Sequence, residues 1–151
     1  MKRINFKVLI ITVVVCLLPM ILGILTYNRL PDEIAIHFGY NNSPNNFDSK
    51  NFAVFDIPMV LAFIQLICCI LNDISNNQKE NQSITLIIKW IIPIIGLIVY
   101  SSIILYALGN KINMQILACM IVGIVMIILG MFFPKSNKKE EEKLNKYLKY
   151  I

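Results

Sequence analysis

A chain of 151 residues is long enough for one soluble domain, but its composition excludes that class. Hydrophobic residues make up 57% of the chain and charged residues 15%, and the mean hydropathy is +0.68. The long apolar runs show no alternation at helix or strand period, so lipid is their natural solvent. The net charge of +5 does not indicate nucleic acid, because the basic residues gather beside apolar runs, as at a membrane surface.

Four apolar runs predict four transmembrane helices. They cover residues 8–27, 52–71, 84–108 and 114–133. Each reaches the roughly 20 residues that a helix needs to cross about 30 Å of hydrocarbon. The first run is too long for the apolar region of a signal peptide and lacks a small-residue cleavage site, so we expect it to stay as a signal anchor. The expected fold class is an all-α integral membrane protein, a four-transmembrane-helix bundle.

The distribution of Lys and Arg predicts the orientation of this bundle. Of the 14 basic residues, only Arg29, Lys50 and Lys111 lie on the side that holds residues 28–51. By the positive-inside rule, both termini are then cytoplasmic and residues 28–51 form an extracytoplasmic loop. The abundance of Ile, Asn and Lys beside only two Arg favours a bacterium with an AT-rich genome. We therefore expect a multi-pass protein of a bacterial plasma membrane.

Two charged residues fall within the predicted spans. We expect Lys89 to reach the inner surface along its aliphatic stem, with Trp90 as an interfacial anchor, in preference to an ion-pathway role. Asp56 lies about one turn inside the second run, where an ionised group is costly. It is expected at the outer interface, either hydrated or beside a basic partner from the same side.

The C-terminal tail, residues 134–151, predicts a short amphipathic helix in the cytoplasm. Its apolar residues recur at helical spacing within a strongly charged stretch. They are Leu144, Tyr147, Leu148 and Ile151. A helix lying on the inner leaflet is the favoured interpretation, and a docking helix for a cytoplasmic regulator is the alternative.

The predicted outer loop carries the most specific sequence. Pro31 fixes a turn where the chain leaves the first helix, and residues 34–38 alternate as in a short strand with one apolar face. The Asn-rich residues 41–46 have turn chemistry, because Asn tolerates left-handed backbone angles. We therefore expect this loop to be folded.

The loop also resembles a known family, the bacterial membrane domain of unknown function 1648, as found at the N-terminus of SdpI-type bacteriocin-immunity proteins. The resemblance lies in a Leu-Pro-x-x-Ile-x-x-His-Phe pattern directly after a first membrane helix, followed by a turn, a proline and Ser-Lys. The matching residues are Leu30, Pro31, Ile34, His37, Phe38, Pro44, Ser49 and Lys50. Together with Asp56, they are our candidate ligand-binding or partner-binding residues.

The chain departs from the family pattern at three loop positions. Ala35 stands where proline is usual, Asn42 where glycine is usual and Asn45 where aspartate is usual. Asn is the best substitute for a left-handed glycine, so we expect the turn to be kept. Without the aspartate, position 45 loses an acid or metal-ligand role. Residues 130–135 resemble the segment that closes a four-helix unit in the longer immunity proteins, but a charged tail replaces the block expected after it.

The resemblance implies a non-enzymatic immunity or protection factor whose outer loop meets a secreted antimicrobial peptide. A membrane sensor or tether that relays to a cytoplasmic partner through the tail is the alternative. A small transporter component is less favoured, because the strong polar residues left within the spans, once Lys89 and Asp56 are assigned to the interfaces, are uncharged. They are Gln65, Ser101, Ser102 and Gln115.

An enzyme is not expected from the residue types present. A catalytic zinc needs three protein ligands, and His37 is the single histidine of the chain. The four cysteines lie in apolar runs with no zinc or redox spacing and are expected to be reduced packing residues. We therefore expect no catalytic residues, metal or cofactor.

Overall fold

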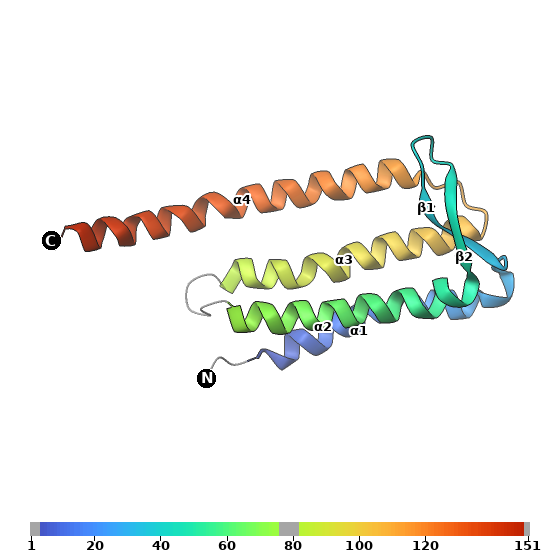
Figure 1. Cartoon of the computed structure of the whole chain (residues 1–151), viewed down its shortest axis with the longest axis horizontal. Helices are drawn as coiled ribbons and strands as arrows, with labels where there is room; N and C mark the ends of the chain where they lie inside the picture. Colours follow the sequence, from blue (N-terminus) through green and yellow to red (C-terminus); the bar gives the residue numbers. More distant parts are fainter. Residues whose placement is uncertain (1–3, 76–81, 150–151) are drawn as a thin grey trace. The chain divides into compact units, whose positions relative to one another are not determined.

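The computed structural model describes residues 4–75 and 82–149. In chain order the elements are α1 (Phe6–Thr26), a 3-10 turn (Tyr27–Arg29), β1 (Glu33–Phe38), β2 (Pro44–Ser49), a π-helical turn (Phe52–Asp56), α2 (Ile57–Ser75), α3 (Gln82–Ala107) and α4 (Met114–Leu148) (Figure 1). The chain divides into two compact units, Met1–Cys119 and Met120–Ile151.

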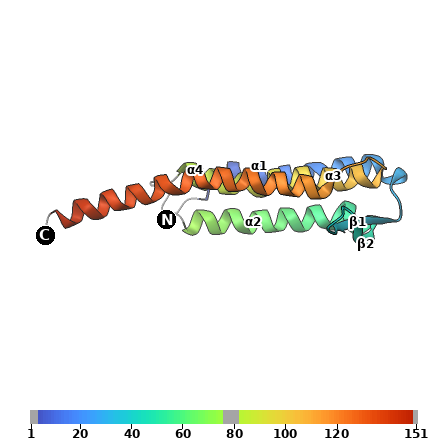
Figure 2. The same cartoon turned by 90° about the horizontal axis from the view of Figure 1, so that it is seen from above.

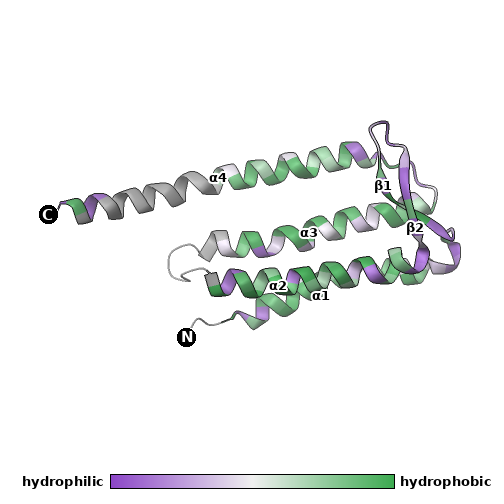
Figure 3. Cartoon of the chain, viewed as in Figure 1, coloured by the Kyte–Doolittle hydropathy of each residue, from purple (hydrophilic) through white to green (hydrophobic). Residues whose placement is uncertain are grey.

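The predicted four-span, all-α architecture is confirmed within the described ranges. The four helices long and apolar enough to cross a membrane cover Phe6–Arg29, Phe52–Ile74, Thr85–Ala107 and Met114–Met131. Side-chain caps begin two of them: Asn5 Oδ1 accepts the N–H of Val8 at 3.3 Å, and Asn113 Oδ1 accepts that of Ile116 at 3.0 Å. Hydrophobic residues dominate along the helices, and hydrophilic residues gather on β2 (Figure 3).

Helix α4 runs without interruption from Met114 to Leu148. The stretch expected to form a separate tail helix therefore continues the fourth span. The side chains of residues 132–144 and residue 147 lie outside the described part of the chain, as does Ile151, so the amphipathic stripe stays a prediction. Lys2, Arg3 and Lys79, which contribute to the predicted orientation, also lie outside the described residues.

Helices α1, α2 and α3 lie side by side, and the β1–β2 hairpin lies across one end of them (Figures 1 and 2). Glycines let the helix backbones approach closely. A Cβ added at Gly96 of α3 would lie 2.2 Å from Leu61 Cδ2 of α2, and one added at Gly23 of α1 would lie 2.9 Å from Tyr100 Oη. Small residues at such contacts are typical of helix packing in membranes.

Three prolines, Pro19, Pro58 and Pro93, lie in this three-helix bundle, and two of them accompany a hydrogen bond between α2 and α3. Pro58 lies in the first turn of α2 and has no N–H, and Tyr100 Oη of α3 donates to the carbonyl of Val54, four residues earlier in the π-helical turn, at 3.2 Å. Pro93 likewise has no N–H for the carbonyl of Lys89. Gln65 Nε2 of α2 donates to the Lys89 carbonyl at 2.8 Å. Side chains of α2 and α3 therefore donate across their interface to backbone carbonyls that lie four residues before a proline.

Candidate functional site

The hairpin is built from one strand that the sequence predicts and one that it does not. β1 and β2 are antiparallel, with Glu33 opposite Ser49 and Phe38 opposite Pro44, and the register is irregular around His37. β2 begins at Pro44, so its Asn residues lie in a strand, although the Asn-rich stretch predicted only a turn. Asn is a poor strand former, and only the pairing with β1 places it here. Pro44 is tolerated because it is the first residue of the strand.

An ion pair closes the base of the hairpin. Lys50 Nζ lies 2.8 Å from Asp32 Oδ1, and the Lys50 N–H donates to the Asp32 carbonyl at 2.9 Å. The Lys50 ammonium also lies 5.2 Å from the centre of the Tyr27 ring, a cation–π contact. Tyr27 Oη in turn donates to Asn51 Oδ1. The hydrogen bond from Lys50 lowers the pKa of the Asp32 carboxyl, and the same bond raises the pKa of Lys50.

A tight turn joins the two strands. The N–H of Gly39 donates to the carbonyl of Ser43 at 2.8 Å, and the N–H of Asn42 donates to the carbonyl of Gly39 at 3.1 Å. Asn42 has φ of 57°, in the left-handed region. The prediction that Asn keeps the turn in place of glycine is therefore confirmed.

The Asn42 side chain also ties the hairpin to the start of α4. Its Nδ2 donates to the carbonyl of Ile112 at 3.1 Å, and its Oδ1 accepts the N–H of Met114 at 2.7 Å. A glycine at this position would make the turn without the tie. Sequence reasoning missed this role, because the partners lie 70 and 72 residues away.

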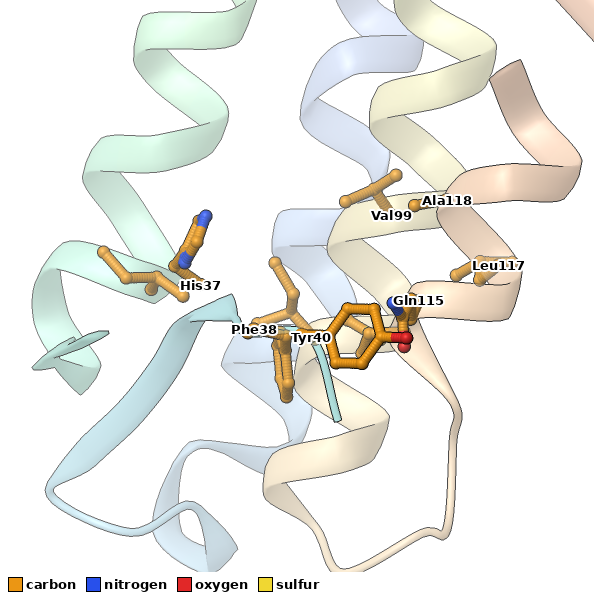
Figure 4. Close-up of a pocket in the computed structure, with 11 residues that line it drawn as sticks. His37, Phe38, Tyr40, Val99, Gln115, Leu117 and Ala118 are labelled. Carbon is orange, nitrogen blue, oxygen red and sulfur yellow. The ribbon is translucent and has the colours of Figure 1, made fainter. Parts of the chain in front are cut away.

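A groove of about 560 Å³ lies between the hairpin and the ends of two helices. Its lining comes from residues 36–40 of the hairpin, Val99 and Ile103 of α3, and Met114, Gln115, Leu117 and Ala118 of α4. Figure 4 shows His37 at one end, Gln115 with Leu117 and Ala118 at the other, and Tyr40 between them. The walls are mostly apolar and contain no Asp, Glu, Lys or Arg, and His37, Tyr40 and Gln115 supply hydrogen-bonding groups. Such a surface suits binding of an uncharged, largely apolar group.

Two of the nine candidate residues lie in this groove. His37 is exposed, and its Nδ1 forms a 2.6 Å hydrogen bond to Asn45 Oδ1, so position 45 still contacts the histidine without the usual aspartate. Phe38 packs edge to face on Tyr106, with ring centres 4.8 Å apart at 84°. The groove therefore places an imidazole and an aromatic ring of the sequence motif on one surface.

The other candidate residues build the hairpin and its base. Leu30 and Ile34 belong to the buried core that the hairpin shares with the span ends, and Ser49 Oγ accepts the N–H of Phe52 at 3.3 Å. Pro31 is exposed, and Pro44 is partly buried. The motif positions of Leu30, Ile34 and Ser49 thus have a structural explanation in these contacts.

Asp56 is exposed on the π-helical turn. Of the basic residues that could have paired with it, Lys50 binds Asp32 instead.

A second cluster lies inside the three-helix bundle, and it corrects the expectation for Lys89. Lys89 Nζ lies 2.5 Å from Asp73 Oδ1, and both side chains are almost fully buried, at 2% and 3% exposure. The prediction that Lys89 reaches water at the inner surface is therefore wrong in this structure. The predicted second span ended at residue 71 and left Asp73 in a loop. α2 continues to Ser75 and so places the Asp73 carboxylate beside the Lys89 ammonium. The carboxylate replaces water as the partner of the ammonium.

The described ranges contain no group of side chains that could bind a metal ion. No three His, Cys, Asp or Glu side chains there lie close enough together to hold a metal ion.

These features define a multi-pass membrane protein with a folded hairpin at one end of its spans. Residues 14–62 match the family model described as Domain of unknown function (DUF1648). The chain is also 31% identical, over 121 residues, to the Immunity protein SdpI of Bacillus subtilis (strain 168). That match covers 80% of this chain and 57% of the relative, so the chain spans little more than half the relative's length. No solved structure matches.

Residues 14–62 therefore match the DUF1648 model, and the chain shows homology to the SdpI immunity protein. The predicted family resemblance is confirmed, and the matched residues 14–62 contain the hairpin and the ion pair at its base.

The Asp32–Lys50 pair predicts a specific pH dependence. Because the folded-state pKa of Asp32 is lowered, the pair stabilises the hairpin above the ordinary pKa of Asp32, and this contribution is lost as the pH falls through the lowered value. Lys50→Met should move the pKa of Asp32 back toward its ordinary value, whereas Lys50→Arg should keep it low. Carboxyl NMR titration measures this directly, and an unchanged Asp32 pKa in Lys50→Met would contradict the assignment.

Asn42→Gly should remove the two side-chain hydrogen bonds to residues 112 and 114 at the start of α4. It should keep the turn, since glycine accepts the left-handed angle. Two hydrogen bonds are lost, so we expect the free energy of unfolding to fall by about 1–3 kcal/mol. The measurement is chemical unfolding in detergent micelles. Asn41→Gly, at an exposed position in the same turn, is the matched control. Equal losses in the two variants would mean that the tie contributes nothing.

Proposed function

We propose that the protein is a non-enzymatic immunity factor of a bacterial plasma membrane, which protects the cell against a secreted antimicrobial peptide. The observation that carries this proposal is the 31% identity to the SdpI immunity protein over most of this chain. We also propose the orientation in which both termini are cytoplasmic, following the distribution of Lys and Arg. The hairpin and its groove then face the side from which a secreted peptide arrives.

The groove supports this proposal by its position and chemistry. It lies where the hairpin meets the last turns of α3 and the first turns of α4, close to the ends of the candidate spans. A peptide that acts on membranes presents apolar side chains at this level. The apolar walls would receive such side chains, while His37, Tyr40 and Gln115 would hydrogen-bond to the peptide backbone.

A sensor or tether is the second candidate function. It is favoured by the length of α4, which continues from the candidate span ending at Met131 to Leu148 and so extends past the apolar segment. Truncation after Lys135 separates the two functions. It should spare protection by a pure immunity factor and abolish a relay to a cytoplasmic partner.

The protection test compares the survival of sensitive bacteria, with and without this protein, under a panel of secreted antimicrobial peptides. We expect the protein to raise the inhibitory concentration of at least one peptide. Ala118→Phe fills the groove and should reduce this protection by about tenfold, the equivalent of about 1.4 kcal/mol of binding. Cys119→Phe adds a ring at the next, exposed residue of α4 and is the matched control.

Equal sensitivity to every peptide with and without the protein would contradict the immunity function. Equal protection by the wild type and Ala118→Phe, with both proteins present in the membrane at the same level, would remove the groove as the binding site.

A further inference from the structure

The Asp73–Lys89 pair joins all three helices of the bundle. The end of α2 and the start of α3, near which these residues lie in the sequence, are at the end of the bundle opposite the hairpin (Figure 1). Lys89 belongs to α3 and Asp73 to α2, and the second carboxylate oxygen, Oδ2, accepts the backbone N–H of Asn5 at 3.1 Å. Asn5 is the residue that caps α1. One carboxylate therefore holds the start of α1 and the first half of α3 against the end of α2.

Stability alone does not account for such a pair. Removing two charges from water is costly, and apolar side chains of similar volume often stabilise a buried site as well or better. This bundle does use apolar packing at a comparable α2–α3 contact, where Leu61 fits against Gly96. A charged pair at this place differs from that contact because its two groups have a second possible arrangement, in which both charges are hydrated.

The position of the pair makes that second arrangement accessible. Asp73 is two residues from the end of α2 at Ser75, and Lys89 is seven residues, or about 10 Å, from the start of α3 at Gln82. The flexible stem of Lys89 can carry its ammonium to the aqueous boundary once the helices part.

A weakened point in α3 lies beside the pair. Pro93 removes the helical hydrogen bond to the Lys89 carbonyl, and helices bend most readily where a proline interrupts them. The side chain of Gln65, from another helix, donates to that carbonyl instead. A small rotation of the first turns of α3 about this point would separate Lys89 from Asp73 without unfolding the helix.

The buried side chain of Gln65 lies beside the pair and has an oxygen unpartnered among the described residues. It is fully buried, its Nε2 contacts the Lys89 carbonyl and Cys69 Sγ, and its Oε1 has no hydrogen-bond partner in the described part of the chain. An unpartnered buried carbonyl oxygen raises the energy of the closed state. Water that enters as α3 rotates would satisfy this oxygen.

We propose that Asp73 and Lys89 form a latch, and that α3 hinges at Pro93 between a closed state, in which the pair is dry, and an open state, in which water reaches Gln65 and Cys69. The latch does not depend on the proposed immunity function. α3 also lines the groove with Val99 and Ile103, so the latch and the groove share one helix.

Cys69 provides a direct measure of opening, because it is a free thiol with 0% exposure beside Gln65. The experiment follows the alkylation rate of Cys69 by N-ethylmaleimide in membrane vesicles, with the other three cysteines replaced by alanine. Lys89→Met leaves Asp73 unpaired and should raise the rate at least tenfold. Asp73→Leu combined with Lys89→Met replaces the latch by apolar packing and should lower the rate below that of the parent protein.

Pro93→Ala gives an independent test, since it restores the helical donor to the Lys89 carbonyl and should also slow the alkylation of Cys69. Pro19→Ala, at the proline within α1, is the matched control and should leave the rate unchanged. If Lys89→Met fails to fold, the double variant and Pro93→Ala still decide the question. Alkylation at the parent rate or faster in both of these folded variants would overturn the latch. No peptide is used, so failure of the immunity test leaves this result unaffected.

Discussion

The absence of water in the hydrocarbon layer is the constraint on which this structure depends. Each backbone carbonyl that loses its helical donor there needs a donor from the protein itself. Pro93 creates one such carbonyl, at Lys89 of α3, and a second carbonyl, at Val54 in the turn before α2, lies four residues before Pro58. Tyr100 and Gln65 supply the donors across the interface in opposite directions. The α2–α3 pair is therefore held by its polar groups as well as by apolar packing.

The position of the hairpin depends on these contacts between α2 and α3. Tyr100 and Val54 belong to the buried cluster that also contains Leu30 and Ile34, so the residue that donates to the Val54 carbonyl also packs under the hairpin. The Asp32–Lys50 pair closes the hairpin base, and Asn42 ties its turn to α4. The groove forms between these fixed elements. Its shape thus follows from contacts made by residues far apart in the sequence.

Properties that depend on neighbouring residues could be predicted from the sequence. The four spans followed from run length and hydropathy, and the strand at residues 34–38 followed from its alternation. The left-handed Asn42 followed from the intrinsic tolerance of Asn for that conformation. The motif also placed His37 and Phe38 together, and both lie in the groove.

Features that need a distant partner could not be predicted in this way. β2 exists because β1 pairs with it, and its own Asn residues favour a turn. Lys89 was expected in water because its partner, Asp73, lies beyond the apolar run that marked the second span. The second role of Asn42 requires α4, and the role of Gln65 requires the proline of another helix. These contacts set the geometry of the groove and of the buried cluster.

A double-mutant cycle on Tyr100 and Pro58 tests most directly whether cross-helix donors replace the hydrogen bonds that prolines remove. Unfolding free energies in detergent micelles would be compared for Tyr100→Phe, Pro58→Ala and the double variant. In Pro58→Ala the new N–H can donate to the Val54 carbonyl, so Tyr100→Phe should cost less there than in the wild type. We expect a coupling of about 0.6–1.7 kcal/mol, between the mean and the maximum measured for hydrogen bonds between membrane helices. Equal costs of Tyr100→Phe in the two backgrounds would contradict this account.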